Sequence, residues 1–251
     1  MRVLELWRFP VKSLQGERLD VAELGPGGIV GDRSWALFDV ATGFGLTARR
    51  KPDLLFAAAS LRADGVVRIT LPDGTVTDDD AVLSAWLGRP VALRSAAEVT
   101  ERRRYESPED DLDERSGWHD WEGAAGGAFH DNADGRLSLV STATLGTWDR
   151  RRFRSNVVLD GAGEGALQGE RVRLGGAVLA IGTPIPRCVM VTRPQPGGIG
   201  RDTGVLKTIH RERGGDLAMA ARVLVAGTVR TGDLLGPPDA GRRTPRPPAA
   251  H

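Results

Sequence analysis

Cys188 is the only cysteine in the 251-residue sequence, and its neighbours favour thiolate chemistry. Arg187 precedes it, and a positive charge beside a thiol favours the thiolate form. Pro184 and Pro186 restrict the backbone before the cysteine, so a stiff segment carries the thiol. A single cysteine can equally be an inert, buried side chain. The surrounding pattern therefore has to decide between the two interpretations.

Basic and hydroxyl side chains in the first half of the chain could bind a phosphate. Lys12 and Ser13 follow the first predicted strand, and Gly31-Asp-Arg33 and Thr47-Ala-Arg-Arg50 add guanidinium groups. A phosphate requires several donors that converge on one point. Each of these residues alone is typical of a solvated surface.

Composition places limits on the function. The net charge of +1 gives no support to nucleic-acid or membrane binding. One cysteine excludes an intrachain disulfide and an iron–sulfur cluster held by this chain alone. The N-terminal residues lack the apolar run of a signal peptide, and no stretch is long enough to span a membrane. We therefore expect a cytoplasmic protein.

Short alternating stretches between glycine- and proline-rich turns predict a mainly β protein with some α structure. The predicted strands lie at Val3–Phe9, Arg18–Leu24, Trp35–Val40, Leu54–Leu61, Val66–Leu71, Val91–Arg94, Leu137–Val140, Arg171–Leu174, Ala177–Ile181, Val189–Val191, Arg222–Val229 and within Arg151–Leu159. Helices are predicted at Ala81–Leu87, after Ser141–Thr142, and at Val205–Arg213. We expect two β-barrel-like domains, residues 1–95 and 96–236, with short helices covering the barrel ends. A disordered tail, residues 237–251, follows them.

The segment from Tyr105 to Asp131 is acidic and shows no clear period. It is long for a structureless loop in a compact domain, which indicates a functional or mobile segment. Trp118 and Trp121 favour a lid that contacts substrate. A solvated acidic loop with its aromatic side chains packed inward is the alternative.

Several motifs together resemble one family. They are Pro10-Val-Lys-Ser13, Gly31-Asp-Arg33, Arg154-Ser-Asn156, Pro186-Arg-Cys188 and Arg201-Asp202 with the Val205–Ile209 segment that follows. This combination resembles the MOSC domain preceded by an N-terminal MOSC β-barrel domain, as in molybdenum-cofactor sulfurases and amidoxime-reducing molybdoenzymes. The resemblance extends from Met1 to about Leu235.

The resemblance implies a set of site residues. Cys188 would be the catalytic residue and the thiolate ligand of molybdenum, and Arg187 would stabilise it and contact the pterin. The remaining cofactor-binding residues would be Lys12, Ser13, Arg33, Arg154 and Asn156, with Ser141 and Thr142 as further donors at a helix start. Asp202 is a weaker candidate, which could instead cap the following helix.

The resemblance also implies a function: a molybdenum-cofactor oxidoreductase that reduces N-hydroxylated small molecules. A separate ferredoxin, flavoprotein or haem protein would supply electrons, because the sequence has no Gly-x-Gly-x-x-Gly turn for a nicotinamide. Two alternatives stay open, a sulfur transferase that carries a Cys188 persulfide and a non-enzymatic cofactor carrier. A pyridoxal-phosphate enzyme is disfavoured, because no expected motif surrounds Lys12, Lys51 or Lys207.

Overall fold

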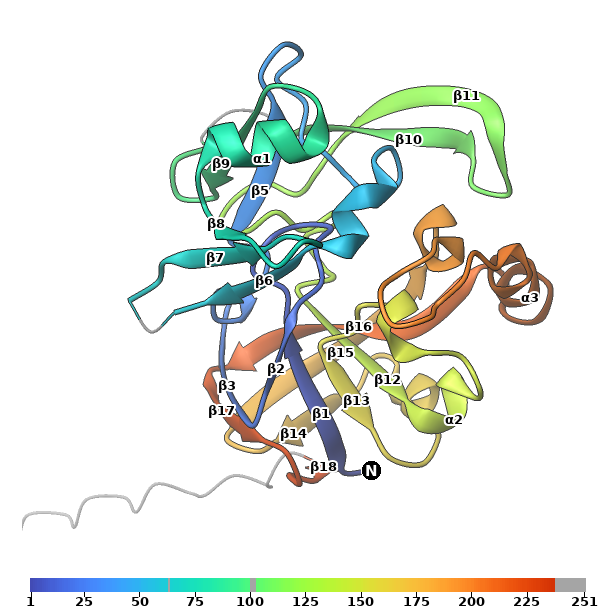
Figure 1. The fold of residues 1–251 in the computed structure, drawn as a ribbon. Coiled ribbons are helices and arrows are strands. Elements are labelled where there is room, and N and C mark those ends of the chain that lie inside the picture. Colours follow the sequence, from blue (N-terminus) through green and yellow to red (C-terminus); the bar gives the residue numbers. More distant parts are fainter. Residues whose placement is uncertain (63, 100–102, 238–251) are drawn as a thin grey trace, which may run out of the picture.

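The computed structural model describes residues 1–62, 64–99 and 103–237 (Figure 1). The protein is mainly β, which confirms the predicted fold class. The largest sheet has eight strands in the order β18-β14-β15-β16-β12-β13-β1-β2. These strands are β1 (Val3–Arg8), β2 (Glu17–Leu19), β12 (Leu137–Ser141), β13 (Val157–Leu159), β14 (Arg171–Leu174), β15 (Ala177–Pro186), β16 (Asp216–Val225) and β18 (Leu235–Gly236). The pair β12–β13 is parallel and the other neighbours are antiparallel.

The centre of this sheet is apolar. All five residues of β12 and all three of β13 are buried. A strand covered on both faces appears in the sequence as a short continuous apolar run, as β13 does. In β12 the buried side chains of Ser138 and Ser141 are hydrogen-bonded instead. The core beneath the sheet includes Leu6, Leu137, Leu159, Leu179 and Val229, which come from both ends of the chain.

A second group of strands packs around its own core. It contains β5 (Trp35–Asp39) paired with β9 (Val91–Ser95), and a sheet of β6 (Ala58–Leu61), β7 (Val67–Thr70) and β8 (Val76–Thr77). The 3₁₀ helix η1 (Pro52–Phe56) and helix α1 (Asp80–Leu87) complete it. Leu37, Leu54, Leu55, Ile69 and Leu83 form the centre of this core.

The two ends of the chain meet in a third small sheet. There β17 (Gly227–Arg230) pairs with β3 (Val21–Gly25), which pairs with β4 (Gly28–Ile29). Residues 1–29 thus contribute to the same core as residues 137–229. The division of the chain at residue 95 stays a prediction.

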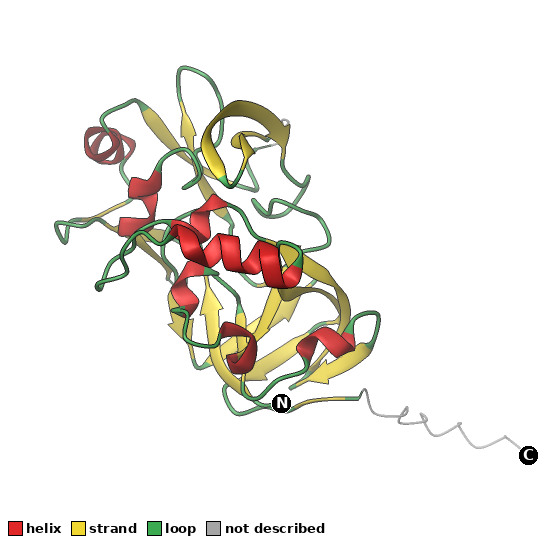
Figure 2. Cartoon of the chain, turned by 90° about the vertical axis from the view of Figure 1, so that its right-hand side faces the viewer, coloured by secondary structure: helices red, strands yellow, loops and turns green. Residues whose placement is uncertain are grey.

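The helices begin and end at residues suited to those positions. The Asp79 side chain accepts hydrogen bonds from the first turn of α1, and Asp202 does the same for α3 (Thr203–Arg213). Both helices end at a glycine with positive φ, Gly88 and Gly214. Helix α3 is the longest, and it crosses the middle of the face seen in Figure 2.

Residues 105–131 are not a structureless loop, and that prediction is wrong for most of the segment. A β-hairpin of β10 (Arg104–Asp110) and β11 (Asp113–Glu122) occupies its first part. Tyr105 pairs with Trp121 across the two strands, and their rings lie 5.0 Å apart. Cross-strand aromatic pairs of this kind stabilise a hairpin. The acidic side chains along the ribbon concealed its strand pattern.

Three further predictions differ from the structure. Val189–Val191 was predicted as a strand but lies in the 3₁₀ helix η4 (Val189–Thr192), where the Thr192 hydroxyl donates to the Val189 carbonyl at 2.8 Å. Residues 52–56 form η1, so only the second part of the predicted strand Leu54–Leu61 is a strand, β6. The strand predicted at Arg222–Val229 is divided between β16 and β17.

Helix α2 (Thr142–Leu145) and the 3₁₀ helices η2 (Arg150–Arg152) and η3 (Glu164–Leu167) complete the described elements. No helix of the described residues is long and apolar enough to cross a membrane. The predicted disordered tail falls outside the described residues from residue 238 onward.

Candidate functional site

A cleft of about 290 Å³ lies between the large sheet and the N-terminal strands. Its walls come from both halves of the chain, with Lys12 and Arg33 on one side and Pro184 to Cys188 on the other. This arrangement brings together six of the predicted site residues besides Cys188: Lys12, Ser13, Arg33, Arg154, Asn156 and Arg187.

Cys188 lies at the end of the segment that continues from β15, and its thiol is half-buried. Its backbone is extended, with φ −111° and ψ 177°, and it is the residue before η4. Arg187 beside it donates to the Leu217 carbonyl at 2.7 Å and to the Phe153 carbonyl at 3.1 Å. Burial lowers the pKa of Arg187 to about 10, and the neighbouring Cys188 partly opposes that shift. The carbonyls fix the orientation of this guanidinium.

Asp131 joins two cations in the cleft. Its carboxylate pairs with the Lys12 ammonium and with Arg49 Nη2, the latter at 2.8 Å. Lys12 also donates to the Phe129 carbonyl at 3.0 Å. Burial lowers the pKa of Lys12 to about 8, although Asp131 opposes the shift. Loss of solvation opposes ionisation of Asp131, but Lys12 and Arg49 still hold its pKa below the usual range.

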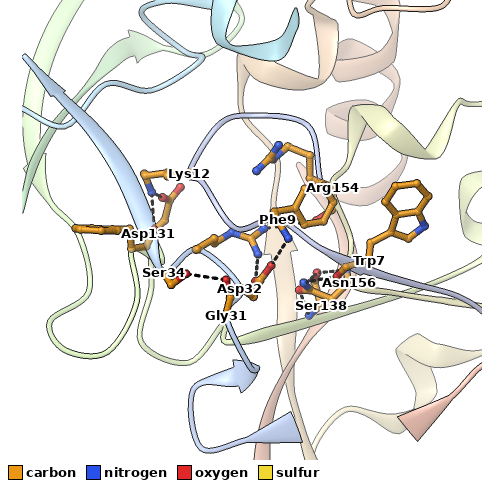
Figure 3. A network of polar contacts seen from close by, with 12 residues as sticks. Trp7, Phe9, Lys12, Gly31, Asp32, Ser34, Asp131, Ser138, Arg154 and Asn156 are labelled. Atoms are coloured by element: carbon orange, nitrogen blue, oxygen red, sulfur yellow. Dashed lines mark hydrogen bonds and ion pairs between the residues drawn. The ribbon is translucent and has the colours of Figure 1, made fainter. Parts of the chain in front are cut away.

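A buried carboxylate, Asp32, organises the residues around Arg33 beside the cleft (Figure 3). Asp32 accepts from the Phe9 backbone N–H at 2.7 Å and pairs with the Arg33 guanidinium. The Arg154 guanidinium lies 4.4 Å from the centre of the Phe9 ring and donates to the Leu14 carbonyl. Burial and the charge of Arg33 lower the pKa of Arg154 to about 9. Two cations are therefore held close together where water has limited access.

Backbone strain is concentrated at this cleft. Four non-glycine residues have positive φ in the described part of the chain: Ser13 (70°), Arg33 (52°), Arg154 (52°) and Ala218 (72°). The first three line the cleft. A left-handed conformation costs a non-glycine residue about 1–2 kcal/mol. Strained residues cluster at functional sites, where their neighbours hold them in place.

The cleft is strongly cationic. Of the described residues that line it, one is acidic, Asp131, and six are basic: Lys12, Arg33, Arg49, Arg152, Arg154 and Arg187. His130 also lines it, and burial and the charge of Arg33 lower its pKa to about 3, so it adds no charge at neutral pH. Such an excess of positive charge, with Lys12 and Arg154 buried, is suited to an anion.

Three of the remaining predicted residues, Ser141, Thr142 and Asp202, do not line the cleft, and Asn156 lines it with its side chain engaged in hydrogen bonds. Ser141 caps α2, since its hydroxyl accepts from the Thr144 N–H at 3.1 Å, and neither Ser141 nor Thr142 lines the cleft. Asn156 lines it, but its side-chain oxygen accepts from Ser138 Oγ at 3.0 Å and its amide donates to the Trp7 carbonyl at 3.1 Å. Asp202 caps α3, as its alternative role predicted.

Four titratable residues of the cleft were not named individually as site residues from the sequence: Arg49, His130, Asp131 and Arg152. Arg49 was visible only as part of the basic stretch Thr47–Arg50. Asp131 is the last residue of the acidic segment, and its pairing with Lys12, 119 residues away, has no local signal.

Two family models match the chain, the MOSC N-terminal beta barrel domain over residues 1–89 and the MOSC domain over residues 128–235. The chain belongs to the MOSC family. Lys12 and Arg33 lie in the first matched range, and Arg154 and Cys188 lie in the second. Residues from both matched domains therefore line the cleft. MOSC domains are associated with molybdenum-cofactor sulfurases and oxidoreductases, which links this chain to molybdenum-cofactor chemistry in general.

Two solved structures were compared with the MOSC chain. The YUAD protein from Bacillus subtilis is 14% identical with a TM-score of 0.41, and the match covers 93% of each chain. YiiM from Geobacillus stearothermophilus is 17% identical with a TM-score of 0.32, and the match covers 41% of this chain and 54% of the YiiM chain. No curated protein shows significant sequence similarity to it.

Proposed function

We propose that this MOSC protein binds a molybdenum cofactor in the cleft and reduces N-hydroxylated compounds. One observation carries the proposal: the single cysteine of the chain lies in a cleft lined by six basic side chains. A soft thiolate ligand suits molybdenum, and the basic groups suit the phosphate of a pterin cofactor.

The donors left in the cleft fit such a group. Within the described residues, the Arg154 side chain has one hydrogen-bond acceptor, the Leu14 carbonyl, although a guanidinium carries five N–H groups. His130 Nε2 is buried and has no hydrogen-bond partner in the described structure. Buried polar atoms are normally paired, so these two side chains indicate a polar occupant of the cleft.

The positions of the basic residues suggest different roles for them in cofactor binding. Arg33, Arg154 and Lys12 would bind the phosphate and pterin, because their charges lie together on the N-terminal side of the cleft. Arg49 lines the cleft with Cys188 and pairs with Asp131, so it would place a positive charge near the metal ligand. Arg187 would fix the peptide that bears the cysteine, since carbonyl groups occupy its donors.

Cys188 would be the one protein ligand, and the cofactor dithiolene would supply further sulfur ligands. Among the described residues, no group of three or more His, Cys, Asp or Glu side chains could hold a metal ion. The bound cofactor would supply the two-electron chemistry that removes oxygen from the substrate as water. A separate electron-donor protein would recharge it.

Turnover measurements test the reductase function. Protein expressed with the cofactor should reduce an amidoxime when a reduced viologen dye supplies electrons, and NADH alone should give no reaction. The Cys188→Ala variant should be inactive under both conditions. A wild-type preparation that contains cofactor but does not reduce N-hydroxylated compounds would refute the reductase function and leave cofactor binding intact.

A further inference from the structure

The β10–β11 hairpin lies outside both family-matched ranges, which end at residue 89 and resume at residue 128. Its base is firmly attached to the cleft: Tyr105 is fully buried, and the Lys12 ammonium lies 4.4 Å from the centre of its ring. Arg49 lies 5.3 Å from the ring centre of Trp121. From this base the ribbon arches toward the side of the molecule where α3 lies (Figure 1).

The hairpin tip touches the peptide that follows the cysteine. Asp111 Oδ1 accepts a hydrogen bond from the Val189 backbone N–H at 3.0 Å. Val189 begins η4, and the first N–H groups of a helix have no acceptor inside it. A residue 78 positions away in the sequence therefore supplies the acceptor that this turn lacks.

A pocket of about 410 Å³ lies between the hairpin tip, η4 and α3. Val189 and Thr192 line it from η4, Thr203 and Leu206 from α3, and Asp111 and Leu112 from the tip. Leu112 is 46% exposed, so the tip presents an apolar side chain at this pocket. The pocket thus borders the peptide after Cys188 on the hairpin side, whereas Cys188 itself lines the cationic cleft.

We propose that Asp111 is a positioning residue that holds the hairpin tip against the peptide after Cys188, so that the hairpin limits the access of large molecules to the thiol. The pocket beside the tip is mixed in character, since the charged side chains of Asp113, Arg115, Arg201 and Lys207 line it together with Leu112 and Leu206. The role of Asp111 is independent of the proposed function, because it concerns access to the thiol.

The single cysteine allows a direct test of access. The full chain, expressed in a host that cannot make the cofactor, is labelled with N-ethylmaleimide and with a long-chain polyethylene glycol maleimide. Any label reports on Cys188. In Asp111→Ala the rate with the large reagent, relative to the small one, should rise by about tenfold, the scale on which losing one charge-assisted hydrogen bond shifts an equilibrium. The ratio cancels any change in the intrinsic reactivity of the thiol.

Two variants complete the test. Asp111→Asn keeps a side-chain oxygen as acceptor and should preserve the wild-type ratio. Asp120→Ala removes a carboxylate of the same hairpin that pairs with Arg104 and lines neither the pocket nor the cleft, so it should also leave the ratio unchanged. A ratio in Asp111→Ala that equals the wild-type ratio, whether or not the two rates themselves change, would overturn the proposal. Because no cofactor is present, these outcomes are independent of whether the protein is a reductase.

Discussion

Arg33 donates a hydrogen bond through Nη2 to the backbone carbonyl of Arg154 at 3.5 Å, and both guanidinium groups lie over the ring of Phe9. The two residues are 121 positions apart in the sequence, and both have φ of 52°. Burial and repulsion by the charge of Arg33 lower the pKa of Arg154 to about 9. An anion bound between them would remove that repulsion. The predictions below follow from this electrostatic arrangement.

Arg154→Gln should weaken cofactor retention by roughly 1.5–3 kcal/mol, the usual scale for a hydrogen bond to a charged group. Arg152→Gln is a matched control, because Arg152 donates to the Val191, Arg193 and Gly200 carbonyls. This control should lower thermal stability and affect retention less. Pterin content after prolonged dialysis measures both effects, and equal losses in the two variants would contradict the separate role of Arg154.

The affinity of the cofactor-free protein for sulfate should fall as the pH rises through about 8, the pKa to which burial lowers Lys12. The sign follows from charge: the anion favours the protonated ammonium, and deprotonation removes that attraction. Lys12→Met should bind sulfate more weakly at neutral pH and show a flatter pH dependence. Titration calorimetry over this range measures the affinities. An equally steep dependence in Lys12→Met would assign the titration to another group.

Asp131→Asn should lower the melting temperature of the cofactor-free protein but tighten its binding of sulfate. The substitution leaves Lys12 and Arg49 without their shared carboxylate and makes the cleft more positive. Asp134→Asn, three residues later on an exposed part of the same loop, removes the same charge without touching the cleft. Thermal unfolding with and without sulfate compares the two. Identical behaviour of both variants would mean that Asp131 acts only through net charge.

The strain at Arg33 can be measured with two substitutions that remove the same guanidinium. Arg33→Gly should be more stable than Arg33→Ala by about 1 kcal/mol, because glycine adopts positive φ without the steric penalty. Both variants should lose cofactor to the same extent. Denaturant unfolding gives the difference in free energy, and an alanine variant as stable as the glycine variant would show that the backbone relaxes to another conformation.

The sequence was most informative where the pattern was local. The strand at Leu137–Val140 and the turn at Gly175–Gly176 are present as predicted, since a mostly apolar strand and a glycine pair act over a few residues. The three-residue run Val189–Val191 was too short to show a period, and packing against α3 made it a 3₁₀ turn. Alternation along β10 and β11 was concealed by acidic residues on their exposed positions.

The same limit applies to the site. Lys12, Arg33, Arg154 and Cys188 were found because each belongs to a short motif, and the structure brings them to one cleft. Asp131 pairs with Lys12, 119 positions away, and Asp111 accepts a hydrogen bond from Val189, 78 positions away. No spacing in the sequence could reveal those pairings, because they depend on how the hairpin and its following loop fold back over the cleft. Ser141 had the residue type of a phosphate donor, but its hydroxyl caps a helix.

The central claim is that Cys188 binds molybdenum in the cationic cleft, and the molybdenum and pterin content of purified protein tests it most directly. Protein from a cofactor-competent host should contain both in nearly equal amounts. Cys188→Ala should lose most of the molybdenum while keeping its fold, because the substitution removes the metal bond but little packing. Wild-type protein without molybdenum or pterin, or full metal retention in Cys188→Ala, would contradict the claim.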